Sequence, residues 1–222
     1  MLHKVLNFVS HRIDMIKLTR DGTTTLYTER FKQYYHSIFG VRAESERVFI
    51  QLGLEYTLER FHQVGILEMG FGTGFNALLS AEKCLETKRK ATYSGLEAYP
   101  ISLESSKELN FDVREFHEVA WGVESKINDY FDFTKYQTSL EKFTTDMKFN
   151  LVYYDAFPPS SQPELWTQEI FEKVAAVMTS DGVLVTYCSK GYVQRNMKAA
   201  KFTVERHPGP PRKREVLRAI LK

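Results

Sequence analysis

The sequence lacks the residue patterns of metal, redox and disulfide-bonded proteins. Its 222 residues include only two cysteines, Cys84 and Cys188, so neither a disulfide framework nor a Cys-x-x-Cys redox or zinc site is available. The six histidines show no metal-ligand spacing. We therefore expect no catalytic metal, and we expect both cysteines to be small buried hydrophobic residues.

Long hydrophobic runs are also missing. No stretch approaches the roughly 18 consecutive apolar residues that a membrane span needs. The start of the chain, "MLHKVLNFVSHRID", is too short and too interrupted by charge to read as a secretory signal. These absences favour a cytoplasmic protein.

The chain is large enough for one domain of ordinary size. Its composition, 43% hydrophobic and 14% aromatic, is sufficient to bury a core. The net charge is +2, but from Lys190 onward ten Lys or Arg face two acids, a local balance of +8 that leaves −6 for the first 189 residues. The basic end is suited to a polyanionic partner, and a merely solvated surface is the alternative.

The first 42 residues read as an N-terminal extension. Within "RDGTTTLYTE" (20–29), Asp21-Gly22 is a turn signal flanked by β-prone residues, which predicts a hairpin. Apolar residues at helical spacing then predict a helix over 43–61. We expect the rest of the chain, residues 43–222, to form one Rossmann-like domain.

Beyond residue 61, strand and helix patterns alternate. Apolar β-prone runs predict strands at 65–70, 91–99, 132–137, 149–157 and 182–189. Helical patterns lie at 75–86, 100–110, 163–178 and 191–201. Two further strand-like runs, 202–207 and 215–222, are joined by a short loop and can pair only antiparallel. The order predicts an α/β fold with a doubly wound, mostly parallel seven-stranded sheet and an antiparallel C-terminal pair.

A glycine-rich loop, "LEMGFGTGFN", follows the first of these strands. The dinucleotide fingerprint G-x-G-x-x-G fails, because Phe75 stands where the third glycine would be, and no Walker lysine is present. The sequence offers E-x-G-x-G-x-G instead, starting at Glu68, and Glu97 closes the next strand. The loop lets backbone N–H groups approach a ligand, and an acid about 20 residues later suits a ribose diol.

A nucleoside without a pyrophosphate fits this pattern, and S-adenosyl-L-methionine (SAM) is such a ligand. A carboxylate near the strand end, Glu68, would neutralise the positive amino-acid end of SAM. The alternative is that the glycines serve only strand-to-helix packing and that Glu68 is solvated.

Several motifs in order resemble one family. The loop, Glu97 and the closing strand pair resemble class I SAM-dependent methyltransferases. More narrowly, the chain from about Asp21 resembles the MnmC-like methyltransferase domain of tRNA 5-methylaminomethyl-2-thiouridine biosynthesis and its stand-alone relatives. The stretches that carry this likeness are "YHSIFGVRAESERVFI", "EMGFGTGFN", "DAFPPSSQPELWT", "TYCSKGYVQRNMKAAKF" and "GPPRKREVL".

This resemblance implies methylation of the exocyclic amine of 5-aminomethyl-(2-thio)uridine at the wobble position, with the tRNA anticodon stem-loop as partner. The bifunctional relatives also carry a flavin-dependent oxidoreductase half, for which we expect a separate protein here. One departure concerns the third strand, where relatives often have an acid for the adenine amino group and this chain offers Ser139.

The resemblance also implies site residues. Those expected to bind SAM are Glu68, Gly70, Phe71, Gly72, Thr73, Gly74, Asn76, Glu97, Ser139 and Asp155. Those expected to contact the substrate are His36, Phe157, Pro158, Tyr187, Arg212, Lys213 and Arg214. For the aromatic residues core packing is the alternative, and for His36 it is a hydrogen-bonded structural role.

Asp155 is the residue we expect to be catalytic. It ends a strand and precedes Ala156-Phe157-Pro158-Pro159, so its side chain should project into the cleft from a loop stiffened by two prolines. An amine must lose a proton before or during attack on a sulfonium methyl group, and a carboxylate can orient it. With an ordinary pKa near 3.9, positioning is a stronger role for Asp155 than deprotonation.

Two other functions remain open from the sequence. One is methylation of a small-molecule amine, which the same loop and Asp155 would serve but which leaves the basic C-terminal end unexplained. The other is a non-catalytic nucleic-acid-binding protein with a vestigial cleft, which the presence of Glu68, Glu97 and Asp155 disfavours.

Overall fold

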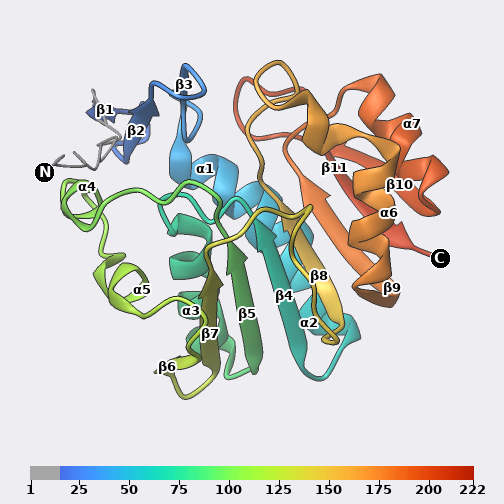
Figure 1. Cartoon of the computed structure of the whole chain (residues 1–222), viewed down its shortest axis with the longest axis horizontal. Helices are drawn as coiled ribbons and strands as arrows, with labels where there is room; N and C mark the ends of the chain where they lie inside the picture. The colour runs from blue at the N-terminus through green and yellow to red at the C-terminus, as the bar shows by residue number, and fades with distance from the viewer. Residues whose placement is uncertain (1–15) are drawn as a thin grey trace, which may run out of the picture.

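The computed structural model describes residues 16–222 of the chain. The first fifteen residues, which include the charged start and part of the predicted extension 1–42, lie outside the described residues. A small three-stranded sheet of order β1-β2-β3 is followed by a sheet of eight strands, ordered β10-β11-β9-β8-β4-β5-β7-β6 (Figure 1).

The small sheet is antiparallel and contains the predicted hairpin. Its strands are β1 (Ile16–Leu18), β2 (Thr24–Thr28) and β3 (Gln33–Tyr34). Asp21 and Gly22 lie in the turn between β1 and β2, as expected, and Gly22 has a φ of +82°.

The large sheet has a parallel centre and antiparallel ends. Its strands are β4 (Val64–Met69), β5 (Ala91–Leu96), β6 (Ser125–Asn128), β7 (Phe131–Tyr136), β8 (Phe149–Tyr154), β9 (Met178–Thr186), β10 (Phe202–Pro208) and β11 (Glu215–Leu221). Strands β7, β5, β4, β8 and β9 are parallel neighbours. The predicted antiparallel pair β10–β11 is confirmed, and β11 pairs with β9.

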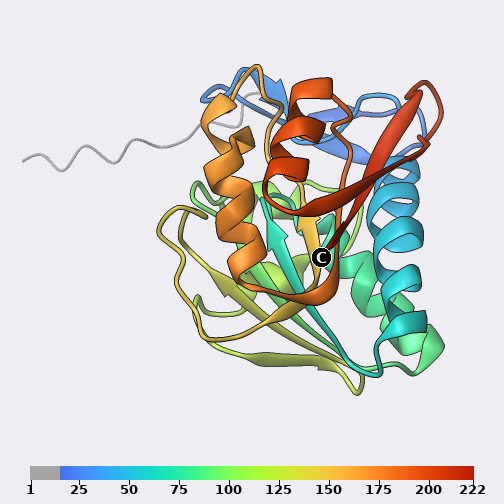
Figure 2. The ribbon, with the colours of Figure 1, turned by 90° about the vertical axis from the view of Figure 1, so that its right-hand side faces the viewer.

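Helices cover both faces of this sheet. One face is covered by α3 (Phe75–Thr87) and by one long helix, made of α1 (Val41–Ser45), a π-helical segment η1 (Glu46–Glu55) and α2 (Tyr56–Arg60). The other face carries α6 (Gln168–Ala176) and α7 (Gly191–Ala199). Figure 2 shows these two layers on either side of the strands.

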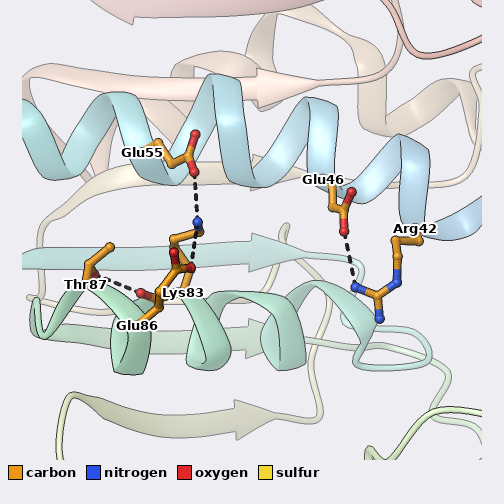
Figure 3. Close-up of polar contacts among 6 residues, drawn as sticks. All are labelled: Arg42, Glu46, Glu55, Lys83, Glu86 and Thr87. Carbon is orange, nitrogen blue, oxygen red and sulfur yellow. Dashed lines mark hydrogen bonds and ion pairs between the residues drawn. The ribbon is translucent and has the colours of Figure 1, made fainter.

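The long helix packs closely on the sheet and on α3. A Cβ at Gly53 would lie 3.0 Å from Val185 Cγ2, so this glycine permits close contact between helix and strands. At the surface, Lys83 Nζ of α3 lies 3.0 Å from Glu55 Oε1 and 2.8 Å from Glu86 Oε2 (Figure 3). Exposed ion pairs of this kind add little stability, so the buried apolar face holds the two helices together.

The α/β class and the mostly parallel sheet are as predicted, but four details differ. The predicted helix 100–110 is only α4 (Leu103–Lys107), and Ser102 caps its start by accepting a hydrogen bond from Ser105 N at 3.1 Å. The predicted helix 163–178 is divided into a 3-10 turn (Pro163–Trp166) and α6 by the extended backbone of Thr167.

The other two differences are additions. Helix α5 (Arg114–Glu118) and strand β6 were not predicted, and β6 brings the sheet to eight strands instead of seven. Strand β6 is a short, polar, partly buried edge strand, which explains why its sequence carries little signal.

The strand order reverses at β4, which lies between β5 and β8. The carboxyl ends of β4 and β8 meet there, and Asp155 N donates to Met69 O at 3.0 Å. In open α/β sheets ligands bind at such a reversal. The small sheet lies above this edge, held by Thr24 N donating to Asn110 Oδ1 at 2.8 Å and by Asn110 N donating to Thr24 Oγ1 at 2.9 Å (Figure 1). Within residues 16–222, no helix combines the length and apolarity of a membrane span.

Candidate functional site

A cavity of about 280 Å³ lies at the carboxyl edge of the large sheet. Its floor is the glycine loop and the ends of β4, β5 and β8, and its roof is the small sheet with the start of the long helix. The predicted site residues that line it are His36, Gly70, Phe71, Gly72, Thr73, Asn76, Glu97, Ser139, Asp155, Phe157, Pro158, Tyr187 and Lys213. Glu68, Gly74, Arg212 and Arg214 do not line it.

All three loop glycines have left-handed backbones, with φ of +95°, +52° and +81° at Gly70, Gly72 and Gly74. A Cβ on Gly70 would lie 2.5 Å from Asp155 O, and one on Gly74 would lie 2.9 Å from Phe71 Cζ. These two glycines therefore let the loop pack on the chain itself. A Cβ on Gly72 would lie 3.0 Å from Tyr35 Cδ1, inside the cavity wall.

The N–H groups of the loop are largely used within the chain. Gly70 N and Phe71 N donate to Leu96 O at 3.1 and 3.0 Å, and Gly74 N donates to Phe71 O at 2.9 Å. Gly72 N donates to Glu97 Oε2 at 2.9 Å. The sequence predicts that these groups approach a ligand, but in the structure they do not form an open anion cradle. A ligand without a pyrophosphate is consistent with this loop.

Glu97 is held firmly at the cavity wall. Its Oε2 accepts from Gly72 N, and its Oε1 accepts from Tyr99 N at 2.8 Å. Burial raises the pKa of this carboxyl, while the N–H groups of Tyr99, Gly72 and Ala98 act in the opposite direction. Each oxygen retains a lone pair, so the carboxylate fits the two hydroxyl donors of a ribose.

Glu68 differs from its prediction, because it is fully buried and lies behind the cavity wall. Asn76 Nδ2 donates to Glu68 Oε1 at 2.9 Å and to Asp155 Oδ2 at 3.0 Å. Burial raises the pKa of Glu68 well above its usual value. Glu68 is therefore not placed to contact a ligand and neutralise its charge directly. Glu68 orients Asn76, and Asn76 orients Asp155.

Asp155 is half-buried at the end of β8 and lines the cavity. Burial, and after it the nearby Glu44 charge, raise its pKa to about 7, while the Asn76 hydrogen bond and Lys213 act in the opposite direction. The sequence alone indicated an ordinary carboxyl. A carboxyl that titrates near neutrality can exchange a proton with an amine as well as orient it.

Aromatic rings form the wall beside Asp155. Phe157 stacks on Phe31 with ring centroids 4.5 Å apart, and it meets Tyr35 edge-on at 5.2 Å. The Tyr187 hydroxyl donates to Ala156 O at 2.8 Å, and this hydrogen bond holds Tyr187 at the cavity wall. Phe71 packs in the core and is only 3% exposed.

His36 joins the small sheet to the glycine loop. Its Nδ1 is 3.3 Å from Thr25 Oγ1, and its Nε2 is 3.2 Å from Thr73 Oγ1. Burial lowers the pKa of His36 to about 4, so the ring is neutral at physiological pH. This geometry matches the structural alternative for His36 better than a direct substrate contact.

The segment after β7 brings Thr138, Ser139 and Glu141 to the cavity. Ser139 was predicted to stand in for the acid of relatives. An acid, Glu141, lines the same wall two residues later, and spacing alone did not identify it.

The three basic residues predicted to contact the substrate are not equivalent. Lys213 lines the cavity and forms an ion pair with Glu44, whereas Arg212 and Arg214 lie outside it.

The lining residues that were not predicted from the sequence include Phe31, Tyr35, Glu44 and Tyr99. Tyr35 and Glu44 both lie within the motif "YHSIFGVRAESERVFI", so the resemblance could have identified them. Across residues 16–222, no cluster of side chains is suited to hold a metal ion.

Comparison with known proteins fits this geometry. The sequence profile of a family described as S-adenosyl-L-methionine-dependent methyltransferase matches residues 126–222. The crystal structure of MNMC2 from Aquifex aeolicus superimposes with a TM-score of 0.78 at 25% identity, covering 96% of this chain and 73% of that one. The chain is a SAM-dependent methyltransferase that is similar to the MnmC proteins. It is similar along most of its length to the relatives that follow.

Two such relatives are bifunctional proteins. The tRNA 5-methylaminomethyl-2-thiouridine biosynthesis bifunctional protein MnmC of Leptospira interrogans is 27% identical over 90% of this chain, and that of Pseudomonas syringae pv. tomato is 28% identical over 68%. This chain spans 34% and 26% of their lengths. The N-methyltransferase NodS from Bradyrhizobium japonicum, solved with S-adenosyl-L-homocysteine, shares the fold with a TM-score of 0.50 at 14% identity.

The glycine loop yields a test of cofactor binding. Gly72→Ala is expected to weaken SAM binding, because the new Cβ at 3.0 Å from Tyr35 Cδ1 pushes that ring into the cavity. Gly122→Ala is the matched control, since Gly122 has a φ of +74° but nothing within 4 Å of a Cβ. Both variants should lose about 1 kcal/mol of folding stability from backbone strain. Only Gly72→Ala should lose SAM affinity by calorimetry, and equal affinities would contradict this role for Gly72.

Proposed function

We propose that this enzyme transfers a methyl group from SAM to the exocyclic amine of 5-aminomethyl-(2-thio)uridine at the wobble position of tRNA. The observation that carries the proposal is the position of Asp155. Asn76 holds it in the cavity at the strand reversal, beside both the glycine loop and the aromatic wall. The similarity to proteins named for 5-methylaminomethyl-2-thiouridine biosynthesis supports the choice of substrate.

The residues of this cavity fit SAM. Glu97 offers oxygens to the ribose, and the segment from Thr138 to Glu141 borders the region for the base. The buried Asn76 Oδ1 has no hydrogen-bond partner within the described residues, and it is an acceptor for the amino-acid end. When bound, SAM supplies an electrophilic methyl group on a positively charged sulfur.

Asp155 acts on the substrate amine. The amine nitrogen can attack only with a free lone pair, so the ammonium must release a proton. A carboxylate with a pKa of about 7 accepts that proton more readily than an ordinary aspartate would. Its hydrogen bond to the remaining N–H aims the lone pair at the methyl carbon. The N–C bond forms as the S–C bond breaks, so the positive charge passes from sulfur to nitrogen, leaving S-adenosylhomocysteine and a secondary ammonium.

The proposed substrate fixes the enzyme's place in a sequence of reactions. The aminomethyl group must be present before methylation, so a separate flavin-dependent oxidoreductase is proposed to produce it. A tRNA substrate also places the proposed activity in the cytoplasm.

The test is mass spectrometry of nucleosides. Purified protein is incubated with SAM and with tRNA that carries 5-aminomethyl-2-thiouridine, and the digest is examined for its N-methylated product. The free nucleoside and small primary amines serve as competing substrates. Methylation of small amines in preference to tRNA would overturn the proposal in favour of a small-molecule enzyme, and no methylation at all would overturn the enzyme assignment.

Asp155 yields a prediction about pH. Since its pKa is about 7, the wild-type carboxyl is ionised above neutrality and protonated below it, so kcat/KM should fall as the pH decreases through 7. Asp155→Asn should reduce turnover by roughly 10²- to 10⁴-fold and remove the titration with a midpoint near 7. SAM binding should persist in the variant. A near-normal rate for Asp155→Asn across this pH range would exclude Asp155 as the catalytic residue.

The arginines on either side of Lys213 yield a prediction about tRNA binding. Replacing Arg212 and Arg214 by Gln should weaken binding and reduce the slope of log K against log salt by about 0.7 to 0.9 for each phosphate that the loop no longer neutralises. Changing Lys88 and Lys90 to Gln removes the same charge at the opposite edge of the sheet, before β5, and is the control. If both double variants retain the wild-type slope, tRNA does not dock on this loop.

A further inference from the structure

A pocket suited to an organic cation lies on the substrate side of the cavity. Its walls are the carboxylates of Glu44 and Asp155 and the ring of Tyr187, all half-buried and all lining the cavity. The hydrogen bond from the Tyr187 hydroxyl to Ala156 O, 2.8 Å long, fixes the ring. Carboxylates and an aromatic face together bind an alkylammonium through charge, hydrogen bonds and the π-system.

A side chain of the protein itself fills this pocket. Lys213 Nζ forms an ion pair with Glu44 and lies 4.4 Å from the centroid of the Tyr187 ring. Its charge also reaches Asp155, where it opposes the effect of Glu44 on the pKa. Lys213 ends in a primary ammonium on a methylene group, and so does an aminomethyl substituent. The two groups would make the same contacts and cannot make them together.

The loop between β10 and β11 directs Lys213 into the cavity. Lys213 N donates to Pro210 O at 2.9 Å, which closes a turn whose third residue, Arg212, has a φ of +71°. A left-handed backbone at that position normally selects glycine. Such a conformation persists where neighbouring contacts hold it. Here Arg212 lies over the Phe39 ring at 5.3 Å, and the Glu44 ion pair holds Lys213.

We propose that Lys213 is a placeholder for the substrate ammonium, and that Glu44 is the residue that recognises this ammonium once Lys213 withdraws. The proposal rests on the proposed function, because that function supplies the amine. Substrate binding exchanges one ammonium for another, so Glu44 is never left as an unpaired charge in a half-buried site.

The exchange makes Glu44 a specificity-determining residue. A neutral substituent on the uracil cannot replace the Lys213 ammonium without leaving Glu44 unpaired, and an anionic substituent is repelled by it. Arg212 and Arg214 flank Lys213 in the loop, so phosphates that bind these arginines would draw Lys213 out of the pocket as the tRNA docks.

The test measures nucleoside binding to protein saturated with S-adenosylhomocysteine, by calorimetry. The probe is 5-aminomethyluridine, which has no phosphate, and the neutral 5-hydroxymethyluridine is its control. Lys213→Met keeps most of the stem and removes the charge. If Lys213 fills the pocket about nine-tenths of the time, this variant should bind 5-aminomethyluridine about tenfold more tightly. It should gain less affinity for 5-hydroxymethyluridine, which cannot pair with Glu44. Glu44→Gln should weaken binding of 5-aminomethyluridine alone.

The matched control is Lys198→Met, an exposed lysine of α7 outside the cavity, which should bind both nucleosides as the wild type does. Unchanged or weaker binding of 5-aminomethyluridine by Lys213→Met would overturn the proposal. If the variant in that case also bound tRNA more weakly, Lys213 would be a phosphate contact. Thermal unfolding checks that each variant is folded.

A parallel arm separates this proposal from the proposed function. Wild-type protein is assayed for methylation of tRNA that carries 5-aminomethyl-2-thiouridine. Methylation without tighter nucleoside binding by Lys213→Met overturns the placeholder alone. Tighter binding without tRNA methylation supports the ammonium pocket and overturns the tRNA substrate.

Discussion

The junction between the ends of β4 and β8 is the constraint on which the site depends. Asp155 N donates to Met69 O. Because Gly70 has no side chain, the Asp155 carbonyl oxygen can approach its backbone closely; a Cβ on Gly70 would lie only 2.5 Å from that oxygen. The carboxyl that we propose to be catalytic thereby stands beside the glycine loop through backbone contacts alone. Asn76 then fixes its direction by donating to both Glu68 and Asp155. A buried polar chain of this kind orients its members only while every link is present.

The fold could be predicted from the sequence because the patterns that indicate its strands, helices and turns are local. Alternating strand and helix patterns, the Asp21-Gly22 turn and the closing strand pair each reflect periodicity within a short window. The elements that were missed or misjudged depend on their surroundings. Strand β6 is a polar edge strand, α4 begins only after the Ser102 cap, and an extended Thr167 divides the predicted helix 163–178.

From the sequence, the candidate site could be predicted only at residues that belong to recognisable motifs. Gly70, Glu97 and Asp155 lie at the carboxyl ends of predicted strands, so their common edge could be inferred. That Glu68 lies behind the wall, that burial raises the pKa of Asp155, and that Glu44 meets Lys213 across 169 positions of sequence all depend on tertiary packing. Residue types and spacing do not encode burial, so the sequence could not assign these roles.

The roof of the cavity has a consequence for the exchange of small molecules. The small sheet touches the rest of the chain through a few polar bonds, the His36–Thr73 contact and the stacked rings of Phe31 and Phe157. Leu26 of β2 reaches the apolar cluster between the large sheet and its helices, but the small sheet pairs with no strand of the large sheet. Such a segment can open at a lower free energy than global unfolding requires. Local opening of the small sheet can thus release S-adenosylhomocysteine while the large sheet and its helices stay folded.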